Sequence, residues 1–179
     1  MILQTYKIVF GGTMGAGKSA AIQNLSEVPV VSTEAISTDA QVNEKLLTTV
    51  GIDYGEVTFS GVKIGLYGTP GQDRFNFMWS IVCKGAIGTV VLIDHTRAER
   101  LDDLAFYLNE FQPYGENIII GITHLDEQNT DHAIQSYVDW LLTQNLQYPV
   151  VALDARKKQD VLSVVEKLLE QSQVELPTE

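Results

Sequence analysis

The sequence predicts an α/β fold in which helices cover both faces of a mostly parallel sheet with one antiparallel edge strand. Two observations carry this prediction. Short apolar β-type runs alternate with segments of helical periodicity, and one turn joins two β-type runs with no helix between them. The 179 residues and 45% hydrophobic content suffice for one domain with a sizeable core. We therefore expect a single domain over residues 1–173 and a C-terminal tail over residues 174–179.

The first third of the chain contains four recognisable segments. The run YKIVF ends at a pair of glycines, and a helix is expected from about Gly17 to Ser26. Residues 28–48 have mixed polarity without a firm period, which predicts a long loop. The runs GIDYGEVTF and VKIGLYG flank Ser60-Gly61, a hairpin signal that supplies the antiparallel strand.

The rest of the chain repeats a strand-then-helix pattern. The segment QDRFNFMWSIVCKG has apolar residues at helical spacing, namely Phe75, Met78, Trp79 and Val82. The runs TVVLID, NIIIGIT and YPVVAL predict three further strands. Helices are expected at about residues 100–112, 130–144 and 160–172. This alternation is typical of a parallel sheet wound on both faces.

The composition argues against several classes of protein. The formal net charge is −11 and the pI is about 4.6. Such acidity argues against nucleic-acid binding, which needs lysines and arginines on phosphates, and against direct adhesion to anionic lipid. The apolar runs are too short to span a bilayer, and we expect neither a signal peptide nor a direct membrane anchor. Cys83 is the only cysteine, so no internal disulfide can form, and a cytoplasmic location is expected.

A glycine-rich segment after the first strand fits the phosphate-loop pattern G-x-x-x-x-G-K-[ST] at every fixed position. Glycines let the backbone approach phosphates closely, and the helix N-terminus that follows favours anions. Lys18 would reach the β- and γ-phosphates, and Ser19 would offer its hydroxyl to Mg²⁺. A glycine-rich turn at the start of a helix is the alternative. The predicted phosphate-binding residues are Gly12, Thr13, Met14, Gly15, Ala16, Gly17, Lys18, Ser19 and Ala20.

Two further motifs carry a family resemblance. TTVGIDYGEVTF (48–59), followed by GQDRF (71–75), resembles the Ras-like small GTPases, particularly the Rab branch. The chain resembles more closely the bacterial Ras-like ATP/GTP-binding proteins with Thr-Pro-Gly-Gln at this point, to which the polarity GTPases of gliding bacteria are related. The resemblance covers nearly the whole chain, in order. It implies a P-loop NTPase fold of Ras type and a GTP/GDP switch that uses Mg²⁺, hydrolyses GTP slowly and is regulated by a roadblock-type partner.

The resemblance also implies roles for two switch segments. Thr49 would ligate Mg²⁺ through its hydroxyl, although Thr48 or Thr38 are alternatives if the loop register shifts. Gly71 would donate its N–H to the γ-phosphate, and Gln72 would be the catalytic residue that orients the attacking water. A threonine in a β-strand and a surface glutamine at a helix start are the simpler readings of the same residues.

One position departs from the family pattern. Ras-like proteins carry an aspartate three residues before the switch glycine, where it holds Mg²⁺ through a water, and this chain has Gly68 there. Ser19, Thr49, phosphate oxygens and waters would still complete the octahedron that Mg²⁺ requires, with weaker affinity. Asp94, at the end of the run TVVLID, is a candidate substitute, although a residue that caps the next turn is the other reading.

The segments expected to contact the base also differ from the family. Ras-like proteins use Asn-Lys-x-Asp and Ser-Ala-Lys, where this chain has Thr-His-Leu-Asp and Asp-Ala-Arg. Asp126 would accept two N–H groups of guanine, His124 would stack on the base, and Thr123 would lack the brace that asparagine makes. Ala155 would donate its N–H to guanine O6, and Arg156 would cover the other face. These residues favour guanine over adenine, although Thr-His-Leu-Asp alone would also suit the turn before a helix.

Two other functions remain open from the sequence. A P-loop kinase for a small metabolite would need an arginine-rich lid, but the four arginines, at 74, 97, 100 and 156, are not clustered. A nucleotide-binding scaffold that never hydrolyses its ligand is consistent with Gly68 and with the altered base motifs. Gln72 argues against that scaffold.

Overall fold

The computed structural model describes residues 5–37, 48–71 and 73–174, and of residues 33–37, 48–51 and 73–75 it describes the backbone alone. In this part of the chain seven strands form one sheet in the order β2-β3-β4-β1-β5-β6-β7. The strands are β1 (Thr5–Gly12), β2 (Val31–Ser37), β3 (Thr48–Phe59), β4 (Val62–Gly68), β5 (Gly88–Asp94), β6 (Ile118–Thr123) and β7 (Val150–Ala152).

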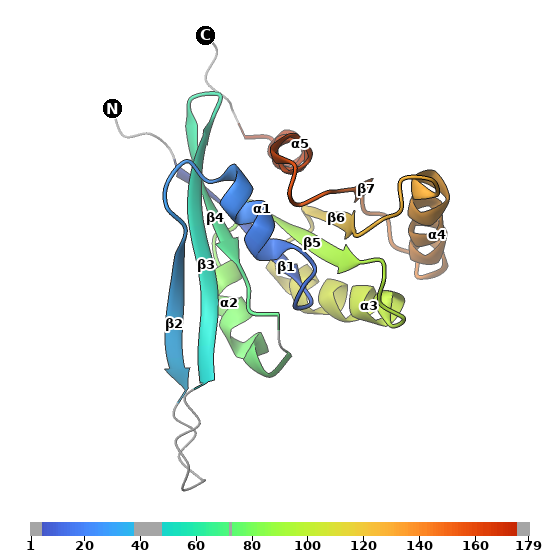
Figure 1. Cartoon of the computed structure of the whole chain (residues 1–179), viewed down its shortest axis with the longest axis horizontal. Coiled ribbons are helices and arrows are strands. Elements are labelled where there is room, and N and C mark those ends of the chain that lie inside the picture. Colours follow the sequence, from blue (N-terminus) through green and yellow to red (C-terminus); the bar gives the residue numbers. More distant parts are fainter. Residues whose placement is uncertain (1–4, 38–47, 72, 175–179) are drawn as a thin grey trace, which may run out of the picture.

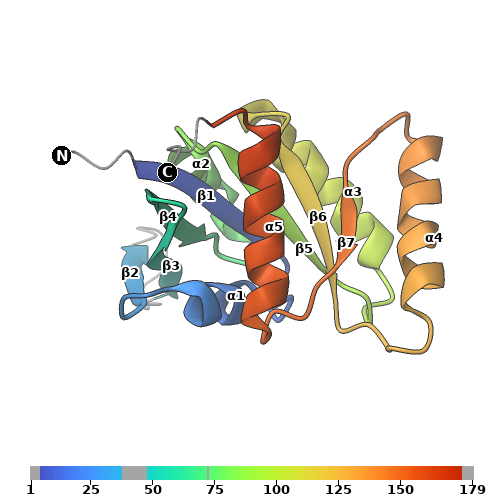
Figure 2. The ribbon, with the colours of Figure 1, turned by 90° about the horizontal axis from the view of Figure 1, so that it is seen from above.

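Helices cover both faces of this sheet (Figures 1 and 2). One face packs against α1 and α5, and the other against α2, α3 and α4. The α-helices are α1 (Lys18–Leu25), α2 (Trp79–Cys83), α3 (Arg100–Phe111), α4 (Thr130–Thr143) and α5 (Lys158–Gln171). Two short 3₁₀ segments, η1 (Asp73–Met78) and η2 (Gln112–Tyr114), accompany α2 and α3. None of the described helices combines the length and the apolar character that crossing a membrane requires.

The two-sided core follows from the strand sequences. In β1, Ile8 and Phe10 are buried on the α1/α5 face, whereas Val9 is buried on the face of α2, α3 and α4. Successive strand residues point to opposite faces, so a strand covered on both sides must be apolar throughout. The same division places Val90 and Leu92 of β5 under α1 and α5. The predicted doubly wound, mostly parallel sheet is therefore confirmed.

The predicted hairpin is also confirmed, with β3 antiparallel to β4 from Phe59↔Val62 to Asp53↔Gly68. The predicted loop over residues 28–48 is wrong for its first part, because β2 pairs antiparallel with β3 over residues 31–37. Val31 and Ser32 are exposed, so this edge strand has no buried face to impose an apolar alternation on the sequence. Residues 38–47 lie outside the described residues.

The predicted helix around Trp79 is split into the 3₁₀ segment η1 and the short helix α2. Trp79 is only 1% exposed and anchors this region in the core. Its ring stacks on Phe111 at 5.2 Å between centroids and lies 5.4 Å from the ring of Tyr107. Its indole N–H donates a hydrogen bond to the carbonyl oxygen of Pro70 at 3.3 Å. One side chain thus fastens the segment after β4 to helix α3.

The carboxyl ends of the central strands meet at one edge of the sheet. Strand β4 ends at Gly68, which pairs with Phe10 of β1, and Asp94 at the end of β5 pairs with Thr123 at the end of β6. In open α/β sheets, ligands bind in the crevice outside these carboxyl ends. A ligand-binding site is therefore expected in the loops that follow these strands.

We predict that Trp79→Ala lowers the free energy of unfolding by about 3–5 kcal/mol, because it removes a buried ring that is packed on three sides. Urea unfolding followed by circular dichroism measures the change. Ile81→Ala is the control, because Ile81 lies two residues away and is 64% exposed. Equal losses in the two variants would contradict the anchoring role of Trp79.

Candidate functional site

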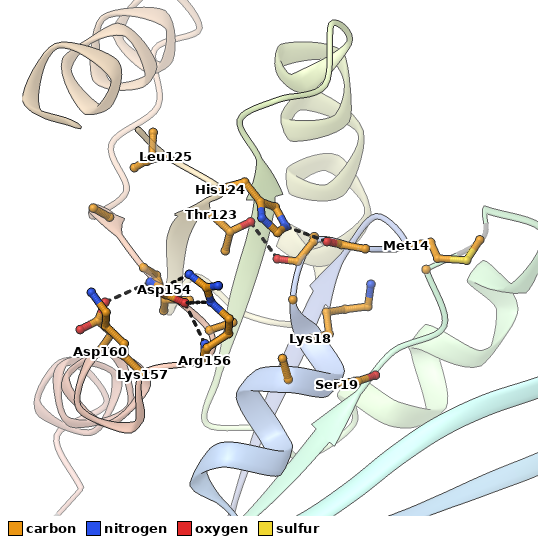
Figure 3. Close-up of a pocket in the computed structure, with 18 of the residues that line it drawn as sticks. Met14, Lys18, Ser19, Thr123, His124, Leu125, Asp154, Arg156, Lys157 and Asp160 are labelled. Atoms are coloured by element: carbon orange, nitrogen blue, oxygen red, sulfur yellow. Dashed lines mark hydrogen bonds and ion pairs between the residues drawn. The ribbon is translucent and has the colours of Figure 1, made fainter. Parts of the chain in front are cut away.

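A cavity of about 730 Å³ opens at the carboxyl edge of the sheet (Figure 3). It is lined mainly by four segments, residues 14–20, 69–71, 123–125 and 152–157. These segments follow β1, β4, β6 and β7 respectively, and most of the predicted site residues belong to them. Gly12 and Thr13 are not among the residues that line the cavity.

The glycine-rich segment takes a conformation that side chains would obstruct. Gly12 has φ of +136°, and a Cβ there would lie 2.2 Å from the carbonyl oxygen of Leu92. Gly17 has φ of +109°, and its Cβ would lie 2.9 Å from that of Ala155. Gly17 is also the N-cap of α1 and makes no side-chain capping bond, so the first N–H groups of the helix remain available to an anion.

Lys18 is the buried cation of the site. Its side-chain ammonium donates hydrogen bonds to the carbonyl oxygens of Gly12 and Thr13, each at 2.6 Å, and the residue is 8% exposed. Burial lowers the pKa of Lys18 from 10.5 to about 8, and the carboxylate of Asp53 offsets part of that shift. Within the described part of the chain, no acidic group forms an ion pair with this ammonium. Among the described residues, the hydrogen bonds of this ammonium therefore go to neutral carbonyl oxygens.

The segment after β4 lies directly against the phosphate loop. A Cβ on Gly71 would lie 2.6 Å from the backbone nitrogen of Met14 and 2.9 Å from Nζ of Lys18. Thr69 fixes this approach, since its N–H and its hydroxyl both donate to the carbonyl oxygen of Phe10, at 2.9 and 3.2 Å. Gly71 therefore lies against the phosphate loop, and its predicted hydrogen bond to the γ-phosphate stays a prediction.

Two other predicted switch residues are placed only in part. Thr49 lies in β3, where its backbone pairs with Ile36 of β2, and its side chain lies outside what the structure describes. Gln72 lies outside the described residues. The roles of Thr49 in binding Mg²⁺ and of Gln72 in catalysis stay predictions.

The expected loss of a brace between β6 and the phosphate loop is corrected by the structure. The hydroxyl of Thr123 donates to the carbonyl oxygen of Ala16 at 2.8 Å, and this threonine is 2% exposed. Nε2–H of His124 donates to the carbonyl oxygen of Gly15 at 3.0 Å, from a residue with φ of +57°. Two short side chains therefore replace the brace that an asparagine would supply.

Residues 152–157, at and after the end of β7, line a further side of the cavity. Ala155 is buried against Gly17, and its carbonyl oxygen accepts a hydrogen bond from Asn24 of α1 at 3.1 Å. The guanidinium of Arg156 is exposed at the rim, where it donates two hydrogen bonds of 2.9 Å to the carboxylate of Asp154 (Figure 3). Those bonds lower the pKa of Asp154 to about 2.

Asp126 lies at the start of the turn that leads into α4, outside the cavity lining. Its Oδ1 accepts a hydrogen bond from the N–H of Gln128 at 3.2 Å. Its Oδ2 has no hydrogen-bond partner among the residues that the structure describes. Glu127 and Thr130 line the cavity beside it. One carboxylate oxygen of Asp126 is thus used by the turn, and the residue is exposed to solvent.

Asp94, the acid considered as a substitute for the one missing at position 68, and Asp53 of β3 have different contacts. Asp94 caps the turn after β5, because its Oδ1 accepts hydrogen bonds from the N–H and the hydroxyl of Thr96, at 2.9 and 2.6 Å. Asp53, which the sequence analysis did not single out, accepts a hydrogen bond from the hydroxyl of Ser19 and lines the cavity. The strand register, counted from the hairpin turn, pairs Asp53 with Gly68. The hairpin in the sequence was therefore the signal that could have placed Asp53 beside position 68.

Among the described residues, no cluster of three or more His, Cys, Asp or Glu side chains is suited to hold a metal ion. A cation bound here would need additional oxygens from its ligand. Mg²⁺ fits this requirement, because it is usually held by one or two carboxylates together with substrate phosphates and waters. Ser19 and Asp53 are the side-chain oxygens that the structure brings together for it.

The chain is similar to several known proteins. A family described as conserved hypothetical ATP binding protein matches residues 28–174. The uncharacterized protein MJ1339 of Methanocaldococcus jannaschii is 34% identical over 97 residues, which cover 54% of this chain and 56% of that protein. Ras-related protein Rab-18-B of Danio rerio is 27% identical over 117 residues, 63% of this chain and 51% of that one. Ras-related protein Rab-10 of Caenorhabditis elegans is 24% identical over 119 residues, 64% and 53% respectively.

The chain therefore spans about half the length of the curated relatives that it matches. The distant Ras and Rab relatives support a Ras-like nucleotide-binding fold. The family match extends over most of the chain, from shortly after α1 to shortly after α5.

We predict that affinity for a nucleoside triphosphate falls as the pH rises above about 8, because the binding form of Lys18 carries a proton that the free protein loses there. Titration calorimetry at pH 9 in two buffers of different ionisation enthalpy should show uptake of about one proton. The same titration at pH 7 is the control, since Lys18 is already protonated. A dissociation constant unchanged between pH 7.5 and 9.5 would contradict this account.

Proposed function

We propose that this chain, which belongs to the family of conserved hypothetical ATP binding proteins, is a Ras-like small GTPase that binds GTP with Mg²⁺ and hydrolyses it slowly. The observation that carries the proposal is the buried ammonium of Lys18, hydrogen-bonded to the phosphate loop and closely approached by Gly71. A triphosphate that bridges these two segments would give the cation its missing anionic partner. The segment after β4 would contact the γ-phosphate of this ligand, so its position would depend on whether that phosphate is present.

The residues of the chain divide the chemistry among them. Lys18 binds the β- and γ-phosphates, and the N–H groups at the start of α1 add further donors. Gly71 places its backbone beside the γ-phosphate position, and Gln72 orients the attacking water. Mg²⁺, when bound, neutralises charge on the β- and γ-phosphates, and the hydroxyl of Ser19 contributes to its site.

Guanine is the proposed base, although the family description names ATP. Asp126 supports guanine, because its Oδ2 has no hydrogen-bond partner within the described part of the chain and a carboxylate accepts two N–H groups of guanine. Ala155, which lines the same cavity and packs against Gly17, would donate its N–H to guanine O6. Adenine offers a carboxylate only one exocyclic amino group, so Asp126 discriminates between the two bases.

The proposed output is a switch between GTP and GDP states. Residues 32–49 and 69–80 would order around the γ-phosphate and lose those contacts after hydrolysis. The contact of Gly71 with Met14 and Lys18 supports this for the second segment, which Trp79 anchors at its far end. A roadblock-type regulatory protein is the partner that we propose for the switch surface.

A P-loop kinase is a weaker candidate. Two of the arginines that a kinase lid would need are committed elsewhere, since Arg97 pairs with Asp103 and Arg156 with Asp154. A scaffold that binds but never hydrolyses nucleotide is favoured by one observation, the absence of an acid at Gly68. Hydrolysis measurements separate this scaffold from the GTPase.

We predict that Asp126→Asn weakens GTP binding and improves binding of xanthosine triphosphate. Xanthine presents O2 where guanine has an amino group, so an amide donor suits it better than a carboxylate. The mismatch should cost on the order of 1–3 kcal/mol for GTP, measured by calorimetry with both nucleotides. Asp131→Asn, on the exposed first turn of α4, is the control. Unchanged affinities for both nucleotides would place base recognition elsewhere and make ATP the candidate.

We also predict intrinsic GTP hydrolysis on the order of 10⁻³ s⁻¹ or slower, the rate expected when no arginine is inserted beside the phosphates. Single-turnover hydrolysis with purified protein measures it, and Gln72→Ala should lower the rate by about tenfold. Gln147→Ala, at an exposed glutamine far along the chain, is the control. If the protein alone hydrolyses GTP fast and Arg74→Ala loses most of that rate, the arginine comes from the chain itself. That result would contradict a mechanism in which a partner accelerates hydrolysis.

A further inference from the structure

We propose that Asp53 supplies the carboxylate of the Mg²⁺ site, in place of an acid at position 68. The inference rests on the proposed function, because it concerns the cation that accompanies the nucleotide in the same cavity. It assigns a metal-site role to a strand residue that lies outside the phosphate loop and outside the two proposed switch segments, residues 32–49 and 69–80. If Asp53 has this role, the glycine at position 68 no longer implies weak affinity for Mg²⁺.

The first argument is the position of the Asp53 carboxylate. Its Oδ2 accepts a hydrogen bond from the hydroxyl of Ser19, and its Oδ1 accepts one from the hydroxyl of Ser32 on β2. Ser19 follows Lys18 at the start of α1, so the carboxylate lies beside the phosphate loop. Asp53 is also one of the residues that line the cavity.

The second argument is space. Asp53 and Gly68 are directly paired across β3 and β4, so their side chains would project from the same face of the sheet. A Cβ on Gly68 would lie 3.4 Å from Cβ of Asp53, 3.7 Å from its Oδ2 and 3.0 Å from Cδ1 of Ile22. The carboxylate of Asp53 thus occupies the room into which a longer side chain at position 68 would extend. The glycine on β4 and the acid on β3 are complementary.

The third argument is that three other acids, at positions 94, 154 and 160, are bonded to protein groups. Asp94 caps the turn at Thr96 through Oδ1. Asp154 pairs with Arg156, and Asp160 accepts a hydrogen bond from the N–H of Asp154 at 3.0 Å. Among the described acids that line the cavity, Asp53 is the one that contacts Ser19.

The donor set suits the chemistry of Mg²⁺. This cation takes oxygen ligands and usually combines one or two carboxylates with phosphate oxygens and waters. In its bond to Asp53, the hydroxyl of Ser19 is the donor, so the lone pairs of its oxygen remain for a metal. Asp53 therefore orients the hydroxyl of Ser19, which would ligate Mg²⁺. It also supplies the negative charge that the site lacks because position 68 is a glycine.

The test measures the Mg²⁺ dependence of nucleotide binding in Asp53→Asn, a variant of nearly the same shape without the charge. Fluorescent mant-GDP is titrated in EDTA and at a series of free Mg²⁺ concentrations, and Mn²⁺ binding to the GDP complex is followed by electron paramagnetic resonance. We expect unchanged affinity in EDTA and a rise of about tenfold or more in the Mg²⁺ and Mn²⁺ concentrations at half-saturation. Asp94→Asn is the matched control and should behave as wild type.

A second variant moves the charge across the two strands. Asp53→Ala combined with Gly68→Asp should recover most of the Mg²⁺ response, because the space vacated on β3 receives the new carboxylate from β4. Gly68→Asp alone should lower the unfolding midpoint, since two carboxylates then compete for one space. Recovery in the double variant distinguishes a metal ligand from a side chain that only holds β2, β3 and α1 together.

The possible failures are distinguishable. Half-saturating Mg²⁺ in Asp53→Asn within about twofold of wild type would overturn the inference and leave the GTPase proposal standing. An equal loss of mant-GDP affinity with and without Mg²⁺ would also overturn it, because it would show a structural bridge. Wild-type protein that binds no mant-GDP in either condition would overturn the inference and the proposed function together.

Discussion

The rest of the site depends on a buried ammonium that forms no ion pair with any acid that the structure describes. Lys18 is held by two neutral carbonyls 2.6 Å away, and burial lowers the pKa of its side chain to about 8. A cation in this position is destabilised by lost hydration, and an anion that reaches it recovers part of that free energy. The chain as a whole carries a net charge of −11, so the attraction for phosphate is local and depends on the shape of the loop.

That shape is maintained from several sides by groups far apart in the sequence. Thr123 and His124 bond the carbonyl oxygens of the loop, and Ala155 packs against Gly17. Gly71 approaches Met14 so closely that any side chain would have to displace the backbone. Each of these residues follows the carboxyl end of a strand, so the parallel register of the sheet brings them to one edge. The segment after β4 is therefore in direct contact with the phosphate loop, so a ligand in the proposed site would lie against both.

The sequence predicted most of the fold and the phosphate loop, because their signals are local. Buried parallel strands are continuously apolar, and the glycine pattern fixes the loop around Lys18. Strand β2 escaped prediction, since an exposed edge strand needs no alternation at Val31. The role of Asp53 was not predicted because it arises from a cross-strand pairing with Gly68. The brace made by Thr123 was not predicted because a hydroxyl takes the place of the expected amide. These roles come from tertiary proximity, which a linear motif does not record.

The identity of the nucleotide that occupies the site tests the central claim most directly. Purified protein loaded with an equimolar mixture of GTP and ATP in Mg²⁺, then desalted and denatured, releases its ligand for anion-exchange chromatography and mass spectrometry. The account predicts guanine nucleotide at close to one per chain, and essentially none from Lys18→Ala, which removes the buried cation. Release of adenine nucleotide in preference to guanine, or equal guanine nucleotide from Lys18→Ala, would contradict it.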